Sequence, residues 1–454
     1  MADLGAIFKA YDVRGLVPSQ LDKSTTRQIG GAFADEVLDG SSESAVVVGH
    51  DMRSTSVPLS NAFSDGVRDR GADVVRIGLA STDQLYFASG RLRLPGAMFT
   101  ASHNPAAYNG IKLCRAGAVA LSSATGLDAI RARLETGRTV SPVSPRGTVE
   151  DRDLLESYAS YLLGLVPVRG RRLKVVVDAG SGMAGHTVPA VLGRLDIDLV
   201  AMYFELDGSF PHHEANPLDP ANLEDLQEAV IAEGADVGLA FDGDADRCFV
   251  IDEQGSVVSP SALTALIAVR CLAEEPGARI IHNLITSRAV PEIIRRHGGV
   301  AIRTRVGHSL IKATMADQNA AFGGEHSGHF YFRDFWYADS GMLAALHLLA
   351  SLAGDESAVS ELVDDLDPYF ASGEINTVLV DTGAVLAAVA DSYGGRPGIT
   401  LDRLDGLTVS ADEWWFNVRA SNTEALVRLN VEGTTTAIMA DVRDEVVALM
   451  RRTT

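Results

Sequence analysis

The stretch DVGLAFDGDADR, residues 236–247, joins a short apolar run to an acidic loop. Its run VGLAF has no polar side chain, as in a strand that is buried on both faces of a sheet. Similar runs precede it in LKVVVDAGSG (173–182) and IDLVAMYF (197–204), and ANLEDLQEAVIAEG (221–234) has apolar residues at helix spacing. This alternation of strand and helix predicts a sheet of parallel type with helices on both faces.

The same alternation occurs twice more along the chain. The other expected strands are AVVVGHD (45–51), ADVVRIG (72–78), GAMFTAS (96–102), ARIIHNLITS (279–288), GVAIRTRVGH (299–308) and AFGGEHSGH (321–329). The last part of the chain is shorter, with strands expected at INTVLV and WWFNVRAS and a helix near the end. We therefore predict three similar mixed α/β domains and a smaller C-terminal α+β domain, at residues 1–145, 146–253, 254–368 and 369–454.

The composition narrows the class of protein. The 454 residues include 60 acidic and 39 basic side chains, and the net charge of −21 disfavours nucleic acid or an anionic membrane as the main partner. The cysteines Cys114, Cys248 and Cys271 are odd in number and far apart, which disfavours a disulfide framework. The N-terminus has no signal-peptide pattern, and the apolar segment 341–354 is too short to span a bilayer. A soluble, cytoplasmic protein is expected.

The acidic loop is a candidate metal site. Asp242, Asp244 and Asp246 stand at alternate positions, so their carboxylates can point at one hard cation such as Mg²⁺. An EF-hand is an alternative, because Glu253 falls at loop position 12, but Arg247 stands where that loop needs glycine. A solvated acidic turn is a further alternative, which the apolar flanking residues disfavour. We favour a catalytic magnesium site in which Arg247 faces a phosphate.

Two further motifs carry polar side chains at suggestive spacings. RASNTEALVR (419–428) combines arginines, hydroxyls and an amide, which suits a phosphate, but Ser421 and Glu424 also have the spacing of a helix capping box. In GGEHSGH (323–329), Glu325, Ser327 and His329 alternate, which suits vicinal sugar hydroxyls or an ordinary turn. His308 and Lys312 of VGHSLIK lie near an expected helix start, where surface or capping roles are favoured on local evidence.

The stretch FTASHNPAAYNGIK (99–112) places Ser102 directly after an apolar strand. It lacks the G-x-S-x-G pattern of an acyl-transfer nucleophile. His103 is not assumed to be its base, because neighbouring side chains usually diverge. A serine that carries phosphate, beside a metal ion, would instead transfer a phosphoryl group.

Five motifs occur in a fixed order: FKAYDVRG (8–15), TASHNP (100–105), DGDADR (242–247), GEHSGH (324–329) and RASNTEALVR (419–428). Together they span nearly the whole chain. In this order they resemble the α-D-phosphohexomutase family, in its phosphomannomutase/phosphoglucomutase branch. The resemblance implies that the three similar α/β domains and the smaller C-terminal domain surround a central cleft.

The resemblance also implies a role for each motif. Ser102 would carry the phosphoryl group and, with Asp242, Asp244 and Asp246, hold Mg²⁺. The implied catalytic residues are Ser102, His103, Lys112, Arg247 and His308. The implied substrate-binding residues are Tyr11, Arg14, Glu325, Ser327, His329, Arg419, Ser421, Asn422, Thr423 and Arg428.

The implied activity interconverts mannose 6-phosphate and mannose 1-phosphate through a phosphoserine enzyme and a hexose 1,6-bisphosphate, with glucose phosphates as second substrates. The activator would be glucose or mannose 1,6-bisphosphate, and the enzyme a monomer or homodimer. The alternatives are a phosphoglucomutase and a phosphoglucosamine mutase. His326 stands where many dual-specificity members have methionine, which bears on this choice. A phosphatase or a sugar-phosphate-binding protein would be expected to lack the carrier serine or the phosphate loop.

Overall fold

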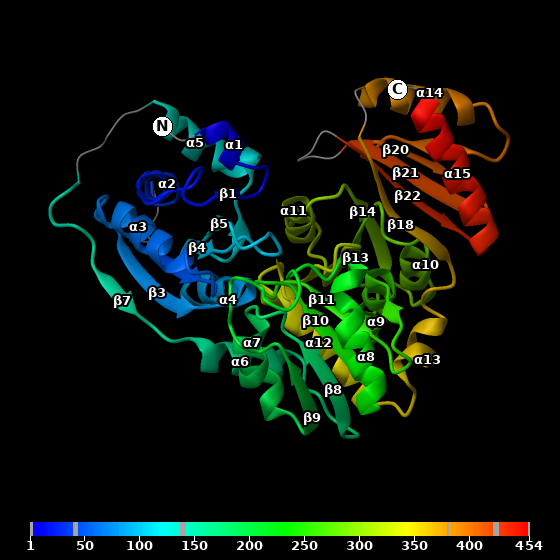
Figure 1. Cartoon of the computed structure of the whole chain (residues 1–454), viewed down its shortest axis with the longest axis horizontal. Helices are drawn as coiled ribbons and strands as arrows, with labels where there is room; N and C mark the ends of the chain where they lie inside the picture. The colour runs from blue at the N-terminus through cyan, green and yellow to red at the C-terminus, as the bar shows by residue number, and fades with distance from the viewer. Residues whose placement is uncertain (1–2, 40–43, 137–141, 379–380, 421–425, 453–454) are drawn as a thin grey trace.

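The computed structural model describes residues 3–39, 44–136, 142–378, 381–420 and 426–452. These residues form four β-sheets, and we call each sheet with its helices a domain, numbered I to IV along the chain. Figure 1 shows them in order around an arc, from the blue domain I at the left, through II and III, to the orange and red domain IV at the upper right. The predicted fold class is confirmed.

Domain I contains a seven-stranded sheet in the order β1-β5-β4-β2-β3-β7, with β6 paired to β5. Its strands are β1 (Val13–Leu16), β2 (Ala45–His50), β3 (Asp73–Leu79), β4 (Gly96–Phe99), β5 (Tyr108–Arg115), β6 (Val119–Ala120) and β7 (Val149–Asp151). Its helices are α1 (Leu4–Ile7), α2 (Lys23–Val37), α3 (Ser56–Arg68), α4 (Thr82–Leu92) and α5 (Leu127–Glu135). Although β7 lies beyond the boundary predicted at residue 145, it pairs with β3 in this first sheet.

Domain II has a five-stranded sheet in the order β12-β11-β10-β8-β9. The strands are β8 (Leu173–Asp178), β9 (Ile197–Met202), β10 (Val237–Phe241), β11 (Cys248–Ile251) and β12 (Val257–Val258), with helices α6 (Leu155–Leu165), α7 (Ala184–Val191) and α8 (Glu224–Glu233). The short β12 lies beyond the boundary predicted at residue 253 but completes this sheet by pairing with β11.

Domain III has five strands in the order β14-β13-β15-β16-β17. They are β13 (Arg279–Asn283), β14 (Val300–Thr304), β15 (Phe322–Gly324), β16 (Phe330–Phe332) and β17 (Ala338–Asp339). The helices are α9 (Pro260–Glu274), α10 (Ala289–Arg296), α11 (His308–Gln318), α12 (Gly341–Ala353) and α13 (Val359–Asp364).

Domain IV differs because every strand pairing of its sheet is antiparallel, in the order β18-β22-β21-β20-β19. The strands are β18 (Phe370–Thr377), β19 (Thr400–Asp402), β20 (Leu407–Ser410), β21 (Trp414–Ala420) and β22 (Val427–Gly433), with helices α14 (Thr382–Tyr393) and α15 (Thr436–Arg452). Short 3₁₀ turns lie at Ser123–Thr125, Leu192–Arg194, Pro220–Leu223 and Arg333–Phe335.

Domains I, II and III repeat one strand pattern. Each has three parallel strands with the first in sequence at the centre, namely β3-β2-β4, β9-β8-β10 and β14-β13-β15. The third strand of each trio then turns back into an antiparallel strand, β5, β11 or β16. The three turns made in this way carry Ser102, the aspartates and Glu325, respectively.

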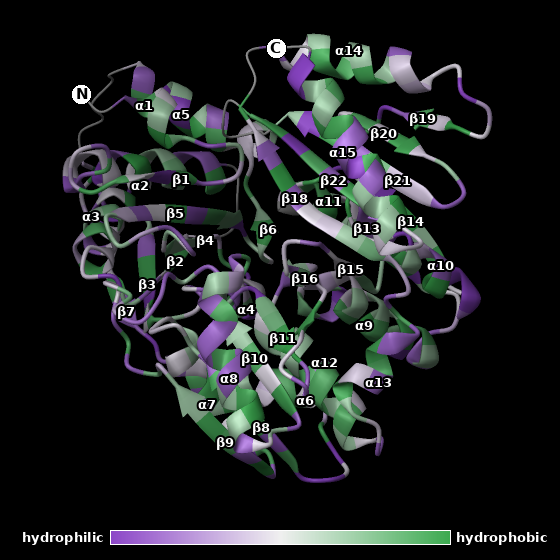
Figure 2. Ribbon diagram, turned by 45° about the vertical axis from the view of Figure 1, so that its right-hand side comes forward, coloured by the Kyte–Doolittle hydropathy of each residue, from purple (hydrophilic) through white to green (hydrophobic). Residues whose placement is uncertain are grey.

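One apolar core joins the first three domains. A continuous cluster of buried side chains includes Val47 of domain I, Val175 of domain II and Ile280 of domain III, whereas domain IV has its own cluster around Phe416. The helix α12 is buried as its sequence predicts, and it is mostly green in Figure 2. Packing therefore fixes domains I to III to one another more firmly than it fixes domain IV.

A buried carboxylate lies where the first three domains meet. Asp83, in the first turn of α4, accepts hydrogen bonds from Ser81 of domain I, from Tyr158 of domain II at 2.7 Å and from Ser340 of domain III at 2.6 Å. The neighbouring Thr82 Oγ1 donates to Asp244 Oδ2 at 2.5 Å. This junction therefore adjoins the acidic loop.

Burial raises the pKa of Asp83 to about 6, against the hydrogen bonds that lower it. The folded protein therefore binds more protons at this group than the unfolded chain does between about pH 4 and pH 6. The free energy of unfolding that Asp83 contributes falls by about 3 kcal/mol as pH rises through that window. We predict that Asp83→Asn, which does not titrate, gains thermal stability relative to the wild type from pH 4 to pH 7. A difference between their unfolding midpoints that does not change with pH would contradict this.

Candidate active site

The three turns place side chains from three domains around one point. Ser102 Oγ donates to Asp242 Oδ2 at 2.7 Å. Lys112 Nζ donates to Asp244 Oδ2 at 2.7 Å and also to Asp246. The structure thus brings together the serine, the three aspartates and the lysine, which the sequence places up to 144 residues apart.

The acidic loop has the geometry of a metal site. Asp242, Asp244 and Asp246 are each no more than 1% exposed, and one oxygen of each lies within 4.8 Å of the others. Asp244 Oδ1 and Asp246 Oδ1 are buried and have no hydrogen-bond partner among the described residues. Buried carboxylate oxygens without donors suit a hard divalent cation. The loop connects two antiparallel strands, β10 and β11, rather than two helices, so the EF-hand alternative is wrong.

Two cations offset this buried negative charge. Arg247 Nε donates to Asp242 Oδ2 at 2.9 Å, and burial raises the pKa of Asp242 despite this arginine. Burial alone would raise the pKa of Asp244, but Lys112 and Thr82 hold it well below its ordinary range. Burial would also lower the pKa of Lys112, but the aspartates outweigh it and raise that pKa. Lys112 is therefore an ammonium group in this arrangement.

The hairpin of β4 and β5 explains why Ser102 and Lys112 both reach the acidic loop. Lys112 pairs with Met98 across the hairpin, so the chain returns past the turn that carries Ser102. Ser102 has a left-handed backbone, with φ of 49°. This conformation is uncommon for residues other than glycine, and it directs Oγ away from the strand and toward Asp242.

His103 also contacts the serine. Its Nδ1 lies 3.1 Å from Ser102 Oγ, so the expectation that the two neighbouring side chains diverge is wrong. The left-handed backbone of Ser102 is the physical reason. Burial lowers the pKa of His103 well below its ordinary value, so its imidazole is neutral.

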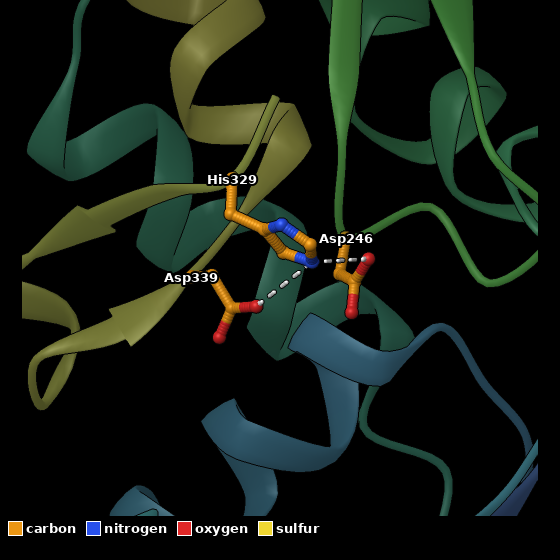
Figure 3. A group of neighbouring side chains, drawn as sticks. All are labelled: Asp246, His329 and Asp339. Atoms are coloured by element: carbon orange, nitrogen blue, oxygen red, sulfur yellow. Dashed lines mark ion pairs between the residues drawn. The ribbon is translucent and has the colours of Figure 1, made fainter. Parts of the chain in front are cut away.

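His329 connects the turn between β15 and β16 of domain III, residues 325–329, to the acidic loop. Figure 3 shows its ring between two carboxylates, with Nε2 at 3.6 Å from Asp246 Oδ1 and at 4.0 Å from Asp339 Oδ2. Asp339 also pairs with Lys312 at 2.5 Å. Lys312 was expected at the surface, but it is only 5% exposed and lies 3.9 Å from the ring centroid of Tyr86. The interface between domains I and III buries it.

The rest of the turn between β15 and β16 presents a carboxylate and a hydroxyl. Glu325 Oε2 accepts from Tyr331 at 2.7 Å, and Ser327 Oγ lies 3.0 Å from His329 Nδ1. Domain I approaches from the other side. The Tyr11 hydroxyl lies close against Gly307: a Cβ added to this glycine would stand only 2.4 Å from the tyrosine oxygen. Arg14 donates to Asn104 Oδ1 in the serine turn.

Domain IV contributes two arginines on neighbouring strands. Arg419 of β21 and Arg428 of β22 are directly opposite each other. Glu374 of β18 accepts from Arg419 at 2.7 Å and lies 3.0 Å from Arg428. The described ends of this motif are strand rather than helix, because Ala420 pairs with Val427. Ser421 and Glu424, which have the spacing of a capping box, lie outside the described residues.

Some predicted residues cannot be placed. Ser421, Asn422 and Thr423 lie outside the described residues, as does the side chain of His308. Sequence reasoning missed several residues that contact this site, among them Thr82, Asp339, Lys312 and Glu374.

Comparison with known proteins supplies the family. Models of the phosphoglucomutase/phosphomannomutase family match α/β/α domain I at residues 5–141, domain II at 156–255, domain III at 259–369 and the C-terminal domain at 374–449. A phosphomannomutase from Escherichia coli is 39% identical over 457 residues, covering 98% of this chain and 99% of that protein. The chain belongs to this family.

Other members of the phosphoglucomutase/phosphomannomutase family are similarly close. A protein named as phosphohexose mutases from Xanthomonas campestris pv. campestris is 39% identical over 98% of this chain and 99% of its own. A crystal structure of a phosphoglucomutase/phosphomannomutase family protein from Burkholderia thailandensis superimposes with a TM-score of 0.91, at 32% identity, over 100% of this chain and 98% of that one. The resemblance that the sequence motifs predicted is confirmed.

In the part of the chain that the structure describes, no helix is long and apolar enough to cross a membrane. This agrees with the interpretation of residues 341–354 as a buried helix.

The acidic loop makes a direct prediction about metal binding. We expect Asp244→Asn to weaken the binding of Mn²⁺, used as a paramagnetic substitute for Mg²⁺, by at least about tenfold, because charged ligands dominate such sites. The binding is measured by electron paramagnetic resonance of the free ion. The control is Asp198→Asn, which changes an exposed aspartate of the same domain. Equal binding by both variants would contradict the metal assignment.

Proposed function

We propose that this chain is a phosphomannomutase that interconverts mannose 6-phosphate and mannose 1-phosphate, with glucose phosphates as second substrates. Ser102 carries the phosphoryl group, and a hexose 1,6-bisphosphate is the intermediate. The observation that supports this best is the contact of 2.7 Å between Ser102 Oγ and Asp242, within the three-aspartate loop. The curated relatives named as phosphomannomutases support the choice of mannose.

The proposed reaction consists of two phosphoryl transfers. Phosphoserine at Ser102 donates to the free hydroxyl of a hexose monophosphate, so the bond from phosphorus to the serine oxygen breaks and a bond to the sugar oxygen forms. The hydroxyl gives up its proton to a base of the site. The serine oxygen that is released takes up a proton from an acid of the site. The bisphosphate then turns end for end, and its other phosphoryl group is transferred to Ser102, which gives up that proton as the phosphoserine forms again. Mg²⁺ bound by Asp242, Asp244 and Asp246 would neutralise charge on the transferred group.

The protein's own side chains supply the remaining electrostatics. Lys112 and Arg247 place positive charge next to the aspartates, where negative charge accumulates on the transferred phosphoryl oxygens. His103, His308 and Lys112 are the proposed proton carriers. Of these, Lys112 is an ammonium group and serves as a donor in the arrangement described here.

Domain IV provides a separate clamp for the phosphate that does not react. Arg419 and Arg428 lie side by side on a hairpin, and a bidentate arginine suits a phosphate. Glu325, Ser327 and His329 would together contact the hydroxyls of the sugar between the two phosphates. Such a clamp must accept either end of the bisphosphate, because the intermediate reverses its direction between the two transfers.

The clamp can be tested by a substitution that keeps its positive charge but changes the geometry of its hydrogen-bond donors. We expect Arg419→Lys to raise the KM for glucose 1-phosphate by at least about tenfold, because lysine keeps the charge but loses the planar donor fork. The matched control is Arg396→Gln, which changes an exposed arginine of the same domain. Initial rates over a range of substrate concentrations give KM, and an unchanged value in Arg419→Lys would reject the clamp.

The function itself is tested by rates with mannose 1-phosphate, glucose 1-phosphate and glucosamine 1-phosphate, with Mg²⁺ and a trace of glucose 1,6-bisphosphate as activator. We expect turnover of the mannose and glucose phosphates only. Turnover of glucosamine phosphate alone would replace the substrate and keep the mechanism. We expect Ser102→Ala to lose most turnover, and full activity in that variant would reject the phosphoserine.

A further inference from the structure

One buried arginine outside the residues already discussed holds the turn that carries Ser102. Arg53 follows β2 and is 2% exposed. Its Nη2 donates to the carbonyl oxygens of Ser102 at 2.9 Å and of Asn104 at 2.6 Å. Its Nη1 donates to the carbonyl oxygens of Pro105 at 3.0 Å and of Tyr108 at 3.1 Å. Both terminal nitrogens of the guanidinium therefore serve this one turn.

The bond to Ser102 bears on the direction of its side chain. Ser102 has a φ of 49°, in a region that is unfavourable for residues with a Cβ. Such a backbone persists only when its surroundings hold it. Arg53 binds the Ser102 carbonyl, and the Thr100 hydroxyl accepts from the Ser102 amide at 2.9 Å. The peptide groups on both sides of the Ser102 Cα are thereby fixed.

Arg53 is itself held from two domains. Asp51 Oδ2 lies 3.2 Å from Arg53 Nε, and Asp51 Oδ1 accepts from the Arg53 amide at 2.9 Å. From domain II, the ring of Phe210 lies 4.9 Å from the guanidinium carbon. The backbone of Gly208 is so close that a Cβ there would stand 2.7 Å from Arg53 Cα. The guanidinium therefore has little freedom to leave the turn.

We infer that Arg53 is a positioning residue for phosphoryl transfer, because it fixes the left-handed turn at Ser102 and so directs Oγ at the aspartates. This inference rests on the proposed function, in which Ser102 is the phosphoryl carrier. Lysine cannot replace arginine here, since one ammonium group lacks the planar fork that reaches four carbonyl oxygens. Within the described residues, the Arg53 guanidinium donates to this turn at backbone carbonyl oxygens alone, whereas Arg419 and Arg428 of the phosphate clamp lie in another domain.

From the position of Arg53 we expect a substitution there to slow the phosphorylation of Ser102 without weakening the binding of the sugar phosphate. Arg53→Lys should slow the phosphorylation of Ser102 by glucose 1,6-bisphosphate about a hundredfold, because a misplacement near 1 Å costs that much. Its Kd for glucose 1-phosphate should stay within about threefold of the wild type, because the phosphate clamp is intact. Phosphorylation is followed by intact-protein mass spectrometry, and Kd by calorimetry on unphosphorylated enzyme. Arg76→Gln, an arginine of β3 in the same sheet, is the control.

A second variant tests the same point without removing the guanidinium. Gly208→Ala lies in a loop of domain II, and its Cβ would stand 2.7 Å from Arg53 Cα, so it should displace the backbone of Arg53. We expect slower phosphorylation of Ser102 with an unchanged Kd, together with a lower unfolding midpoint because a backbone atom must shift. Wild-type phosphorylation rates in both variants would overturn the inference. The inference would also be overturned if the phosphorylation rate fell only in proportion to sugar-phosphate binding and thermal stability, since that is a purely structural effect. Failure of the wild type to become phosphorylated at Ser102 would overturn the proposed function as well.

Discussion

The structure depends on how three buried carboxylates are neutralised. Asp242, Asp244 and Asp246 are almost wholly inaccessible to water, and three adjacent negative charges in such a place would repel one another strongly. Within the described residues, the positive charge that contacts them comes from Arg247 on the same loop and from Lys112 of domain I. The acidic loop therefore stabilises the interface between domains I and II, and the same interface completes the acidic loop.

The site is built from the equivalent turns of domains I, II and III, so that each domain supplies groups that the others need. In each of domains I to III the chain reverses after the third strand of a parallel trio, and the reversal places polar residues at the end of the sheet. A backbone bridge between Arg247 and His329 links the turns of domains II and III directly. Helix α12 begins at Gly341, where a Cβ would stand 2.7 Å from the backbone of Arg247. Helix α12 can approach the acidic loop this closely only because a glycine stands at the contact.

Domain IV is related to the site in a different way. Its core is separate from the cluster shared by the first three domains, and its arginines are held by its own Glu374. An arginine pair that is assembled within one domain keeps its geometry wherever that domain lies. This suits a phosphate clamp that must serve both orientations of a reversing intermediate. The pH behaviour of the protein, in contrast, should reflect groups such as Asp83, where the first three domains join.

The sequence by itself determined the local structure and the family. Apolar runs such as VGLAF predict strands because their pattern depends only on neighbouring residues, and the order of the motifs was enough to recognise the family. It did not reveal that Arg53, Lys312, Asp339 and Glu374 contact the site. A single charged residue in a sequence does not indicate which distant residue it will pair with. The carbonyl oxygens that Arg53 binds lie about 50 residues away, and the two carboxylates that Lys112 binds lie more than 130 residues away. It also offered a helix capping box within RASNTEALVR, whereas the described ends of that motif, Arg419–Ala420 and Val427–Arg428, pair as strands. Only tertiary structure decided which charges meet, because burial and pairing are properties of the assembled domains rather than of any segment.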